Sequence, residues 1–142
     1  MARKTATIVI DADNRDKGQT YIVTEMNAVD GAKLSFQLFQ LLASAGVDID
    51  IQAIQEKGVS EVLGILMRVI SQVPPEEFDM YRETLMKCVQ WQNPQNATIK
   101  RALVPSDVEE ISTIYRLMMK ALEVTVGGFF TEIQATFIPA KK

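Results

Sequence analysis

The sequence predicts a mainly α-helical α+β fold, in which about four helices pack as one domain beside an N-terminal β-hairpin. Apolar residues recur at helical spacing in several long segments, most clearly in the middle of the chain and towards its C-terminus. Short segments near the N-terminus are instead rich in Thr, Ile, Val and Tyr, which favour strands. We therefore expect helices and strands to pack against one another.

Length and composition are those of a single globular domain. A chain of 142 residues has the size of one ordinary domain, and 47% hydrophobic with 23% charged residues is near the globular average. This balance excludes disordered and fibrous proteins. We treat residues 1–142 as a single domain, with a hairpin over residues 1–26, a helical body over residues 27–128 and an apolar C-terminal tail over residues 129–142.

The hairpin is predicted from two strand-forming segments, residues 5–10 and 20–25, which flank a polar loop over residues 11–18. A lone hairpin is only marginally stable in water, and its outer edges stay open. We therefore expect it to lie against a helix or to pair with a strand of a neighbouring subunit.

The first helix is predicted over residues 27–45. Asn27 is a suitable N-cap, and Gly46 ends the run. Its main apolar stripe repeats at spacings of three and four residues: Leu34, Leu38, Leu41, Leu42 and Ala45. Phe36 and Phe39 lie on other sides of this helix, so the helix is either central in the core or shared with a partner.

Two further helices follow residues 47–55, which we interpret as a loop. Residues 61–72, after Ser60 as a cap, have few polar positions and should be buried nearly all round. Pro74 and Pro75 end this helix, and Pro75 opens the next one, with carboxylates in its first turn near the positive end of the helix dipole. The inner stripe of this next helix comprises Phe78, Tyr81, Leu85 and Cys88.

A small second hairpin and a long helix complete the predicted body. Residues 87–91 and 97–101 favour short strands on either side of a turn-rich segment. Residues 106–109, with the sequence Ser-Asp-Val-Glu, match a capping box. Apolar residues at helical spacing continue from there to residues 127–128, a pair of glycines at which we expect the helix to end.

The residue types that are missing exclude most kinds of chemistry. With no histidine, the commonest general base and transition-metal ligand is unavailable, and the single Cys88 forms neither a disulfide nor a thiolate cluster. We read Cys88 as a small buried hydrophobe in a reducing compartment. No glycine-rich phosphate-binding motif occurs, so the sequence predicts no enzyme and no catalytic, cofactor-binding or metal-ligating residue.

Nucleic acid and membranes are not expected as partners. The net charge is −3, and the basic residues Lys100, Arg101, Arg116 and Lys120 are scattered, which suits a solvated face. The most apolar window, residues 59–73, carries two charged residues and is shorter than the roughly 20 apolar residues of a membrane span.

Acidic clusters have plain structural explanations. Asp11, Asp13 and Asp16 raise the question of calcium, but an EF-hand needs glycine where Asp16 stands and a helix where we predict a strand. We interpret them as a solvated hairpin turn. Paired carboxylates at residues 76–77 and 109–110 suggest acid–base work, but their placement in helix first turns is explained by the dipole alone.

Surplus apolar surface is the feature that points to a function. An all-round apolar helix, the two off-stripe aromatic residues of the first helix and an apolar tail are more than one small domain needs. The alternative is that the domain buries all of it. The candidate partner-binding residues are Phe36, Phe39, Phe129 and Phe130.

The order of these features resembles the tail assembly chaperones of long-tailed bacteriophages and prophages. The first half of the resemblance lies in the sequence YIVTEM at residues 21–26, KL at 33–34, LLASAGV at 41–47 and the apolar helix before Pro74. The second half lies in CVQ at residues 88–90, DVEEI at 107–111, the apolar run 117–126 and GFF at 128–130. The resemblance spans residues 19–131 and contains no catalytic signature.

This resemblance implies a non-enzymatic protein of the host bacterial cytoplasm that binds the tape measure protein and keeps it soluble during tail morphogenesis. It implies a homo-oligomer that is absent from the mature virion, and contact with tail tube subunits through a longer frameshifted form. A client rich in apolar helix surface needs apolar grooves, so the surplus apolar surface of this chain suits the implied role. The alternative is a structural tail completion or adaptor protein retained in the virion.

Overall fold

The structure is a computed structural model that describes residues 3–46 and 59–137, with side chains up to residue 127. Its elements are β1 (Thr5–Val9), β2 (Thr20–Thr24), α1 (Ala28–Ser44), α3 (Val59–Ile70), α4 (Pro75–Met86), β3 (Val89–Asn93), β4 (Asn96–Ala102), the 3-10 helix η1 (Pro105–Asp107) and α5 (Ile111–Phe137). The α+β class, the four helices of the described part and the N-terminal hairpin confirm the prediction.

The two hairpins join into one antiparallel sheet with the order β1-β2-β3-β4. β2 pairs with β3, so that Tyr21 lies opposite Trp91. On the same row, Ile8 of β1 pairs with Tyr21, and Trp91 pairs with Arg101 of β4. Both hairpins were expected, but their union through β2 and β3 was not, because the pairing joins residues about 70 positions apart.

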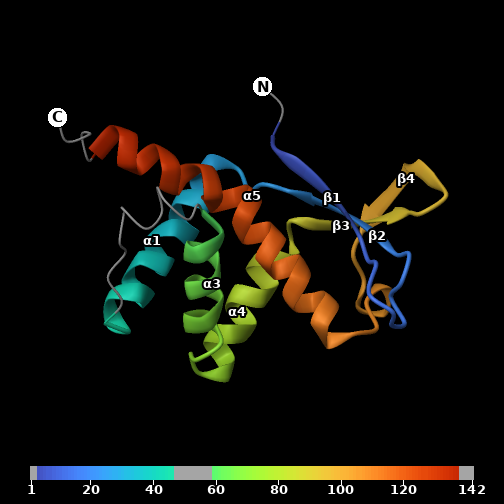
Figure 1. Ribbon diagram of the computed structural model, residues 1–142, viewed down its shortest axis with the longest axis horizontal. Coiled ribbons are helices and arrows are strands. Elements are labelled where there is room, and N and C mark those ends of the chain that lie inside the picture. The colour runs from blue at the N-terminus through green and yellow to red at the C-terminus, as the bar shows by residue number, and fades with distance from the viewer. Residues whose placement is uncertain (1–2, 47–58, 138–142) are drawn as a thin grey trace.

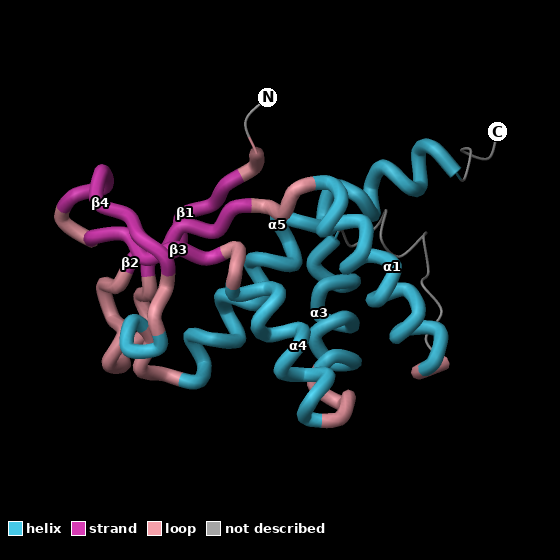
Figure 2. The backbone as a smooth tube through the Cα atoms, turned by 180° about the vertical axis from the view of Figure 1, so that it is seen from behind, coloured by secondary structure: helices cyan, strands magenta, loops and turns pink. Residues whose placement is uncertain are grey.

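Helix α5 runs across the whole molecule and holds its two halves together. The sheet lies beside the N-terminal half of α5, and α1, α3 and α4 pack along the other side (Figure 1). The view from behind shows the same separation of strands and helices (Figure 2). A single hydrophobic core contains residues from both halves, among them Val23, Leu38, Leu66, Leu85 and Leu122.

Local sequence signals place most helix ends correctly. The Asn27 side chain accepts a hydrogen bond of 2.9 Å from the backbone N–H of Asp30, which confirms the predicted cap of α1. Gly46 adopts φ +72°, a left-handed conformation that suits glycine after a helix. Pro75 is the first residue of α4, as expected. In α3, only Ser60 and Arg68 are exposed among residues 60–70. The loop predicted over residues 47–55 lies outside the described residues.

Both predicted ends of the last helix are wrong. The Ser-Asp-Val-Glu segment does not open α5: part of it forms η1, and α5 begins at Ile111. At the other end, Gly127 and Gly128 do not stop the helix, which continues to Phe137. Glycine costs a helix about 1 kcal/mol relative to alanine, and the packing of α5 along the body outweighs this cost.

Candidate partner-binding site

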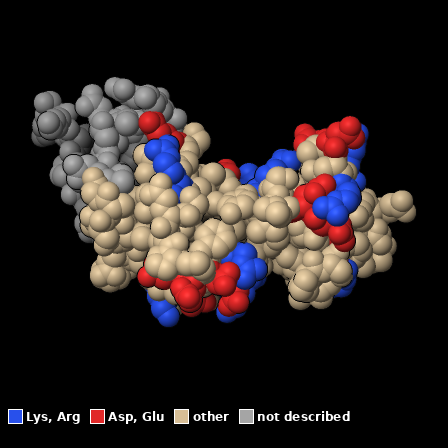
Figure 3. Space-filling model, turned by 90° about the horizontal axis from the view of Figure 1, so that it is seen from below, with Lys and Arg blue, Asp and Glu red and all other residues tan. Residues whose placement is uncertain are grey.

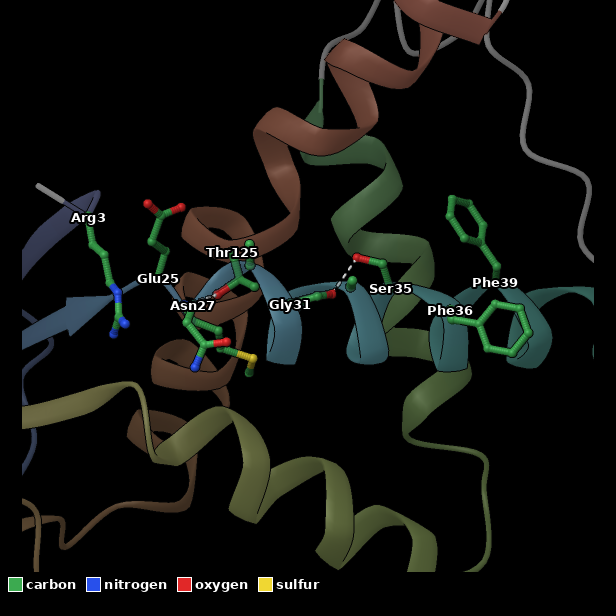
Figure 4. Close-up of a pocket in the computed structure, with 11 residues that line it drawn as sticks. Arg3, Glu25, Asn27, Gly31, Ser35, Phe36, Phe39 and Thr125 are labelled. Carbon is green, nitrogen blue, oxygen red and sulfur yellow. Dashed lines mark hydrogen bonds between the residues drawn. The ribbon is translucent and has the colours of Figure 1, made fainter. Parts of the chain in front are cut away.

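An apolar groove runs along α1, where this helix meets α5 and the connection from β2. Its volume is about 740 Å³. We call it the α1 groove, and its lining residues are Arg3, Glu25, Met26, Asn27, Ala28, Gly31, Ala32, Ser35, Phe36, Phe39 and Thr125. Phe36 and Phe39 lie at one end of the groove and Arg3 with Glu25 at the other (Figure 4).

Small residues on α1 form the floor of the groove. Ala28, Gly31, Ala32 and Ser35 recur at spacings of three and four, so they share one face of the helix. Gly31 lies against α5: a Cβ atom at this position would meet Cγ2 of Thr125 at 3.6 Å. Small side chains along this face leave the space that the two phenylalanines border.

The aromatic end of the groove is open to solvent. Phe36 is 62% exposed and Phe39 is half-buried. The structure therefore brings two of the four predicted partner-binding residues to one groove, although they lie on different sides of the predicted stripe. Phe129 and Phe130 belong to α5, and their side chains fall outside the described residues, so their role stays a prediction.

The polar end of the groove is anchored to the rest of the fold. The backbone N–H of Met26 donates a hydrogen bond of 3.3 Å to the Thr125 hydroxyl on α5. The Glu25 carboxylate accepts a 2.9 Å hydrogen bond from the backbone N–H of Lys4. These contacts tie the connection between β2 and α1 to α5 and to the start of β1.

Sequence reasoning missed the residue that holds the start of α5. We expected Asp16 to belong to a solvated turn, but it is 1% exposed. Its carboxylate accepts hydrogen bonds of 2.9 Å from the backbone N–H groups of Glu109 and Glu110, and one of 2.7 Å from the Thr113 hydroxyl. From a distant loop, Asp16 thus holds the two residues that precede α5 and the first turn of this helix, and no pattern within a single sequence links residues so far apart.

Burial and hydrogen bonding act in opposite directions on Asp16. Burial raises the pKa of its carboxyl, but the hydrogen bonds from Thr113, Glu109 and Glu110 stabilise the charged form, and the net pKa lies below its ordinary value. The neighbouring Arg15 binds the Glu110 carboxylate at 2.9 Å. The loop between β1 and β2 is therefore solvated at Asp11 and Asp13, as expected, but Asp16 anchors it to the start of α5.

Arg101 is exposed, as expected for a solvated face, and it also takes part in a contact network that sequence reasoning did not foresee. Its guanidinium forms two hydrogen bonds of 2.7 Å with the Asp107 carboxylate and lies 4.4 Å from the ring centre of Trp91. The Tyr21 hydroxyl donates a 2.7 Å hydrogen bond to the backbone carbonyl of Asp107, and burial together with the charges of Asp16 and Asp107 raises the pKa of Tyr21 to about 12. This network fixes η1 against the sheet.

Charged side chains of both signs share the surface of the molecule. In the view of Figure 3, acidic and basic side chains are mixed within each charged cluster, and uncharged surface separates the clusters. Across residues 3–46 and 59–137, no group of three or more His, Cys, Asp or Glu is placed to hold a metal ion. No helix of this part has both the length and the apolar character needed to cross a membrane.

The fold and the groove define a class: small α+β proteins with an apolar groove along one helix. Residues 17–137 match the family model described as phage tail assembly chaperone protein, TAC, and the chain belongs to this family. Searches of curated proteins and of solved structures found no match. Membership implies a non-enzymatic role in the assembly of phage tails.

Proposed function

We propose that the protein binds the tape measure protein of its phage and keeps it soluble in the host cytoplasm until tail tube subunits surround it. Membership of the tail assembly chaperone family supports a client among the tail proteins. The α1 groove is the observation that carries the proposal, because it offers exposed aromatic surface beside a floor of small residues. A long, apolar, helical client needs this kind of surface.

The groove suits the apolar face of an amphipathic client helix. Its aromatic end would take large apolar side chains, and its polar end carries one positive and one negative side chain, Arg3 and Glu25. Burying a phenylalanine side chain contributes about 1.5–3 kcal/mol, so one groove alone binds weakly. Several copies on one client would bind tightly through avidity, which is why we include a homo-oligomer in the proposal.

The proposal also covers the contact residues and the further partners of the protein. Phe36 and Phe39 would contact the client in the α1 groove, and Phe129 and Phe130 would extend this surface along α5. A longer frameshifted form would bring tail tube subunits to the complex. The protein itself would leave before the virion is complete.

Co-expression with the tape measure protein encoded in the same genome tests the proposal. We expect the tape measure protein to become soluble only with this chain, in a complex with many copies of it by size-exclusion chromatography with light scattering. Phe36→Ser should lower the soluble yield of the client severalfold. Ile99→Ser is the matched control, since Ile99 is an exposed apolar residue of β4 outside the groove.

Two results would overturn the proposal. If the tape measure protein stays insoluble while the chaperone runs alone as a closed ring and is found in purified virions, a structural component of the tail is the better explanation. If Phe36→Ser and Ile99→Ser solubilise the client as well as the wild type does, the client does not bind in the α1 groove.

A further inference from the structure

The outer edge of β1 is open in the described structure. Lys4 accepts a backbone hydrogen bond from Glu25 of the β2 side, and Ile10 both donates to Gln19 and accepts from Gly18. Backbone groups alternate in direction along a strand, so the even-numbered residues of β1 face β2. The N–H and C=O groups of Thr5, Thr7 and Val9 therefore point away from the sheet, where no described strand pairs with them.

This edge lacks the features that usually prevent strand pairing. Proteins protect open edges with charged residues, prolines or bulges. The other edge strand, β4, carries Lys100 and Arg101, and its pairing with β3 is irregular at Gln92 and Asn93. By contrast, β1 consists of Thr5–Val9 with the sequence TATIV, has regular register, and leaves Val9 54% exposed.

An apolar hollow lies beside the same edge. It has a volume of about 550 Å³ and is lined in part by Ile8 of β1 with Tyr115 and Met119 of α5. Tyr115 is 41% exposed. A strand added to β1 would lie over this hollow, so pairing would bury apolar side chains as well as satisfy backbone groups.

We propose that a second copy of this chain binds here, with the two β1 strands antiparallel about a two-fold axis that passes beside Thr7. Thr7 then faces the partner's Thr7, and Thr5 faces the partner's Val9. All of these residues direct their backbone groups outward, so each pair forms ladder hydrogen bonds. The two four-stranded sheets become one continuous sheet.

Charge complementarity selects this partner. Two residues beyond the Thr5 and Val9 pair, the same register places Arg3 opposite the partner's Asp11. The two-fold axis repeats this pair at the other end of the interface. Arg3 forms no ion pair with the residues that the structure describes. Asp11 forms an ion pair with Arg116 at 3.4 Å, but its side chain is 87% exposed, which leaves room for a second cation. Antiparallel pairing of β1 with β4 of another copy, in the register that sets Thr5 opposite Ile99, would instead bring Arg3 and Lys4 towards Lys100 and Arg101, which repel them.

This interface gives a specific contact for the homo-oligomer of the proposed function, and it rests on the proposed function in that respect alone. The first test is the mass of the protein alone, measured by light scattering without any client. Thr7→Lys places two positive charges face to face at the axis and should halve the mass, with the circular dichroism spectrum unchanged. Thr98→Lys makes the same change on the exposed β4 strand and should keep the wild-type mass.

The second test is a charge exchange. Arg3→Glu and Asp11→Arg should each weaken self-association at least tenfold, and the double variant should restore it, because each copy then supplies both new partners. A monomeric wild type, or Thr7→Lys with the wild-type mass, would overturn the interface. Single charge variants that dimerise as well as the wild type would overturn the register. Because Arg3 also lines the α1 groove, client solubilisation is scored with Thr7→Lys alone, so failure of the interface is distinguishable from failure of client binding.

Discussion

The carboxylate of Asp16 lies 2.7 Å from the hydroxyl oxygen of Thr113, although 97 residues separate them in the chain. Through this contact, the loop between β1 and β2 holds the first turn of α5. Because α5 also forms one side of the α1 groove through Thr125, the loop and the groove are joined by a single rigid helix.

Removal of the Asp16 carboxylate should destabilise the whole fold. Asp16→Ala leaves two backbone N–H groups and one hydroxyl without their acceptor, and we expect the free energy of unfolding to fall by about 2–3 kcal/mol. Urea denaturation measures it. Asp13→Ala in the same loop is the control and should change stability by less than about 0.5 kcal/mol, since Asp13 is fully exposed. Equal effects of the two variants would show that Asp16 is not the anchor.

Stability should fall in acid. Hydrogen bonds from Arg101 lower the pKa of Asp107, those from Arg15 lower the pKa of Glu110, and Asp16 also has a lowered pKa. A carboxyl with a lowered folded pKa stabilises the fold above its unfolded pKa, and this contribution is lost as pH falls through the folded value.

We therefore expect the midpoint of urea unfolding to be constant near neutral pH and to decrease from about pH 4 downwards, where unfolded carboxyls begin to take up protons. Asp107→Asn should be less stable than the wild type at pH 7 and should lose less on acidification. A profile of Asp107→Asn parallel to that of the wild type would contradict this assignment.

Arginine and lysine at position 101 should give proteins of different stability. Arg101→Lys keeps the charge but loses the paired hydrogen bonds to Asp107 and the planar contact with Trp91, so we expect urea denaturation to show a lower free energy of unfolding. Trp91 is the single tryptophan of the chain, and its fluorescence should shift with this change. Arg82→Lys, which alters one exposed contact to Asp79, should leave the emission unchanged.

The Cys88 thiol should react slowly in the folded protein. Burial raises its pKa, and a hydrogen bond with Thr125 offsets this only in part, so little thiolate forms at neutral pH. We expect its labelling by a maleimide reagent to be at least about tenfold slower without urea than in denaturing urea. Ser106→Cys in a Cys88→Ala background provides an exposed thiol for comparison, and equal rates for the two thiols would contradict the burial of Cys88.

Local signals predicted the elements well because they act over a few residues. Asn27 caps α1 through a neighbouring backbone group, Gly46 takes the left-handed conformation that ends this helix, and Pro75 opens α4 with its fixed φ. The ends of α5 escaped prediction because packing competes there with local preference. At Gly127 the weak helix propensity of glycine loses to the contacts of the surrounding helix.

Sequence reasoning pointed to two residues of the α1 groove but did not predict the groove itself. Phe36 and Phe39 were recognisable because they break the apolar stripe of α1, and surplus apolar surface indicated a partner. Their meeting in one groove depends on the position of α5 and on small residues such as Gly31 beside Thr125.

The sequence by itself determined the fold class, most of the helices and both hairpins, since helical periodicity, caps and turn residues need no distant partner. It also carried the resemblance that the family match confirms. Only the tertiary structure decided the pairing of β2 with β3, the burial of Asp16 at α5 and the α1 groove. These features depend on residues far apart in the chain, and their contacts form only when packing of the common core brings the elements together.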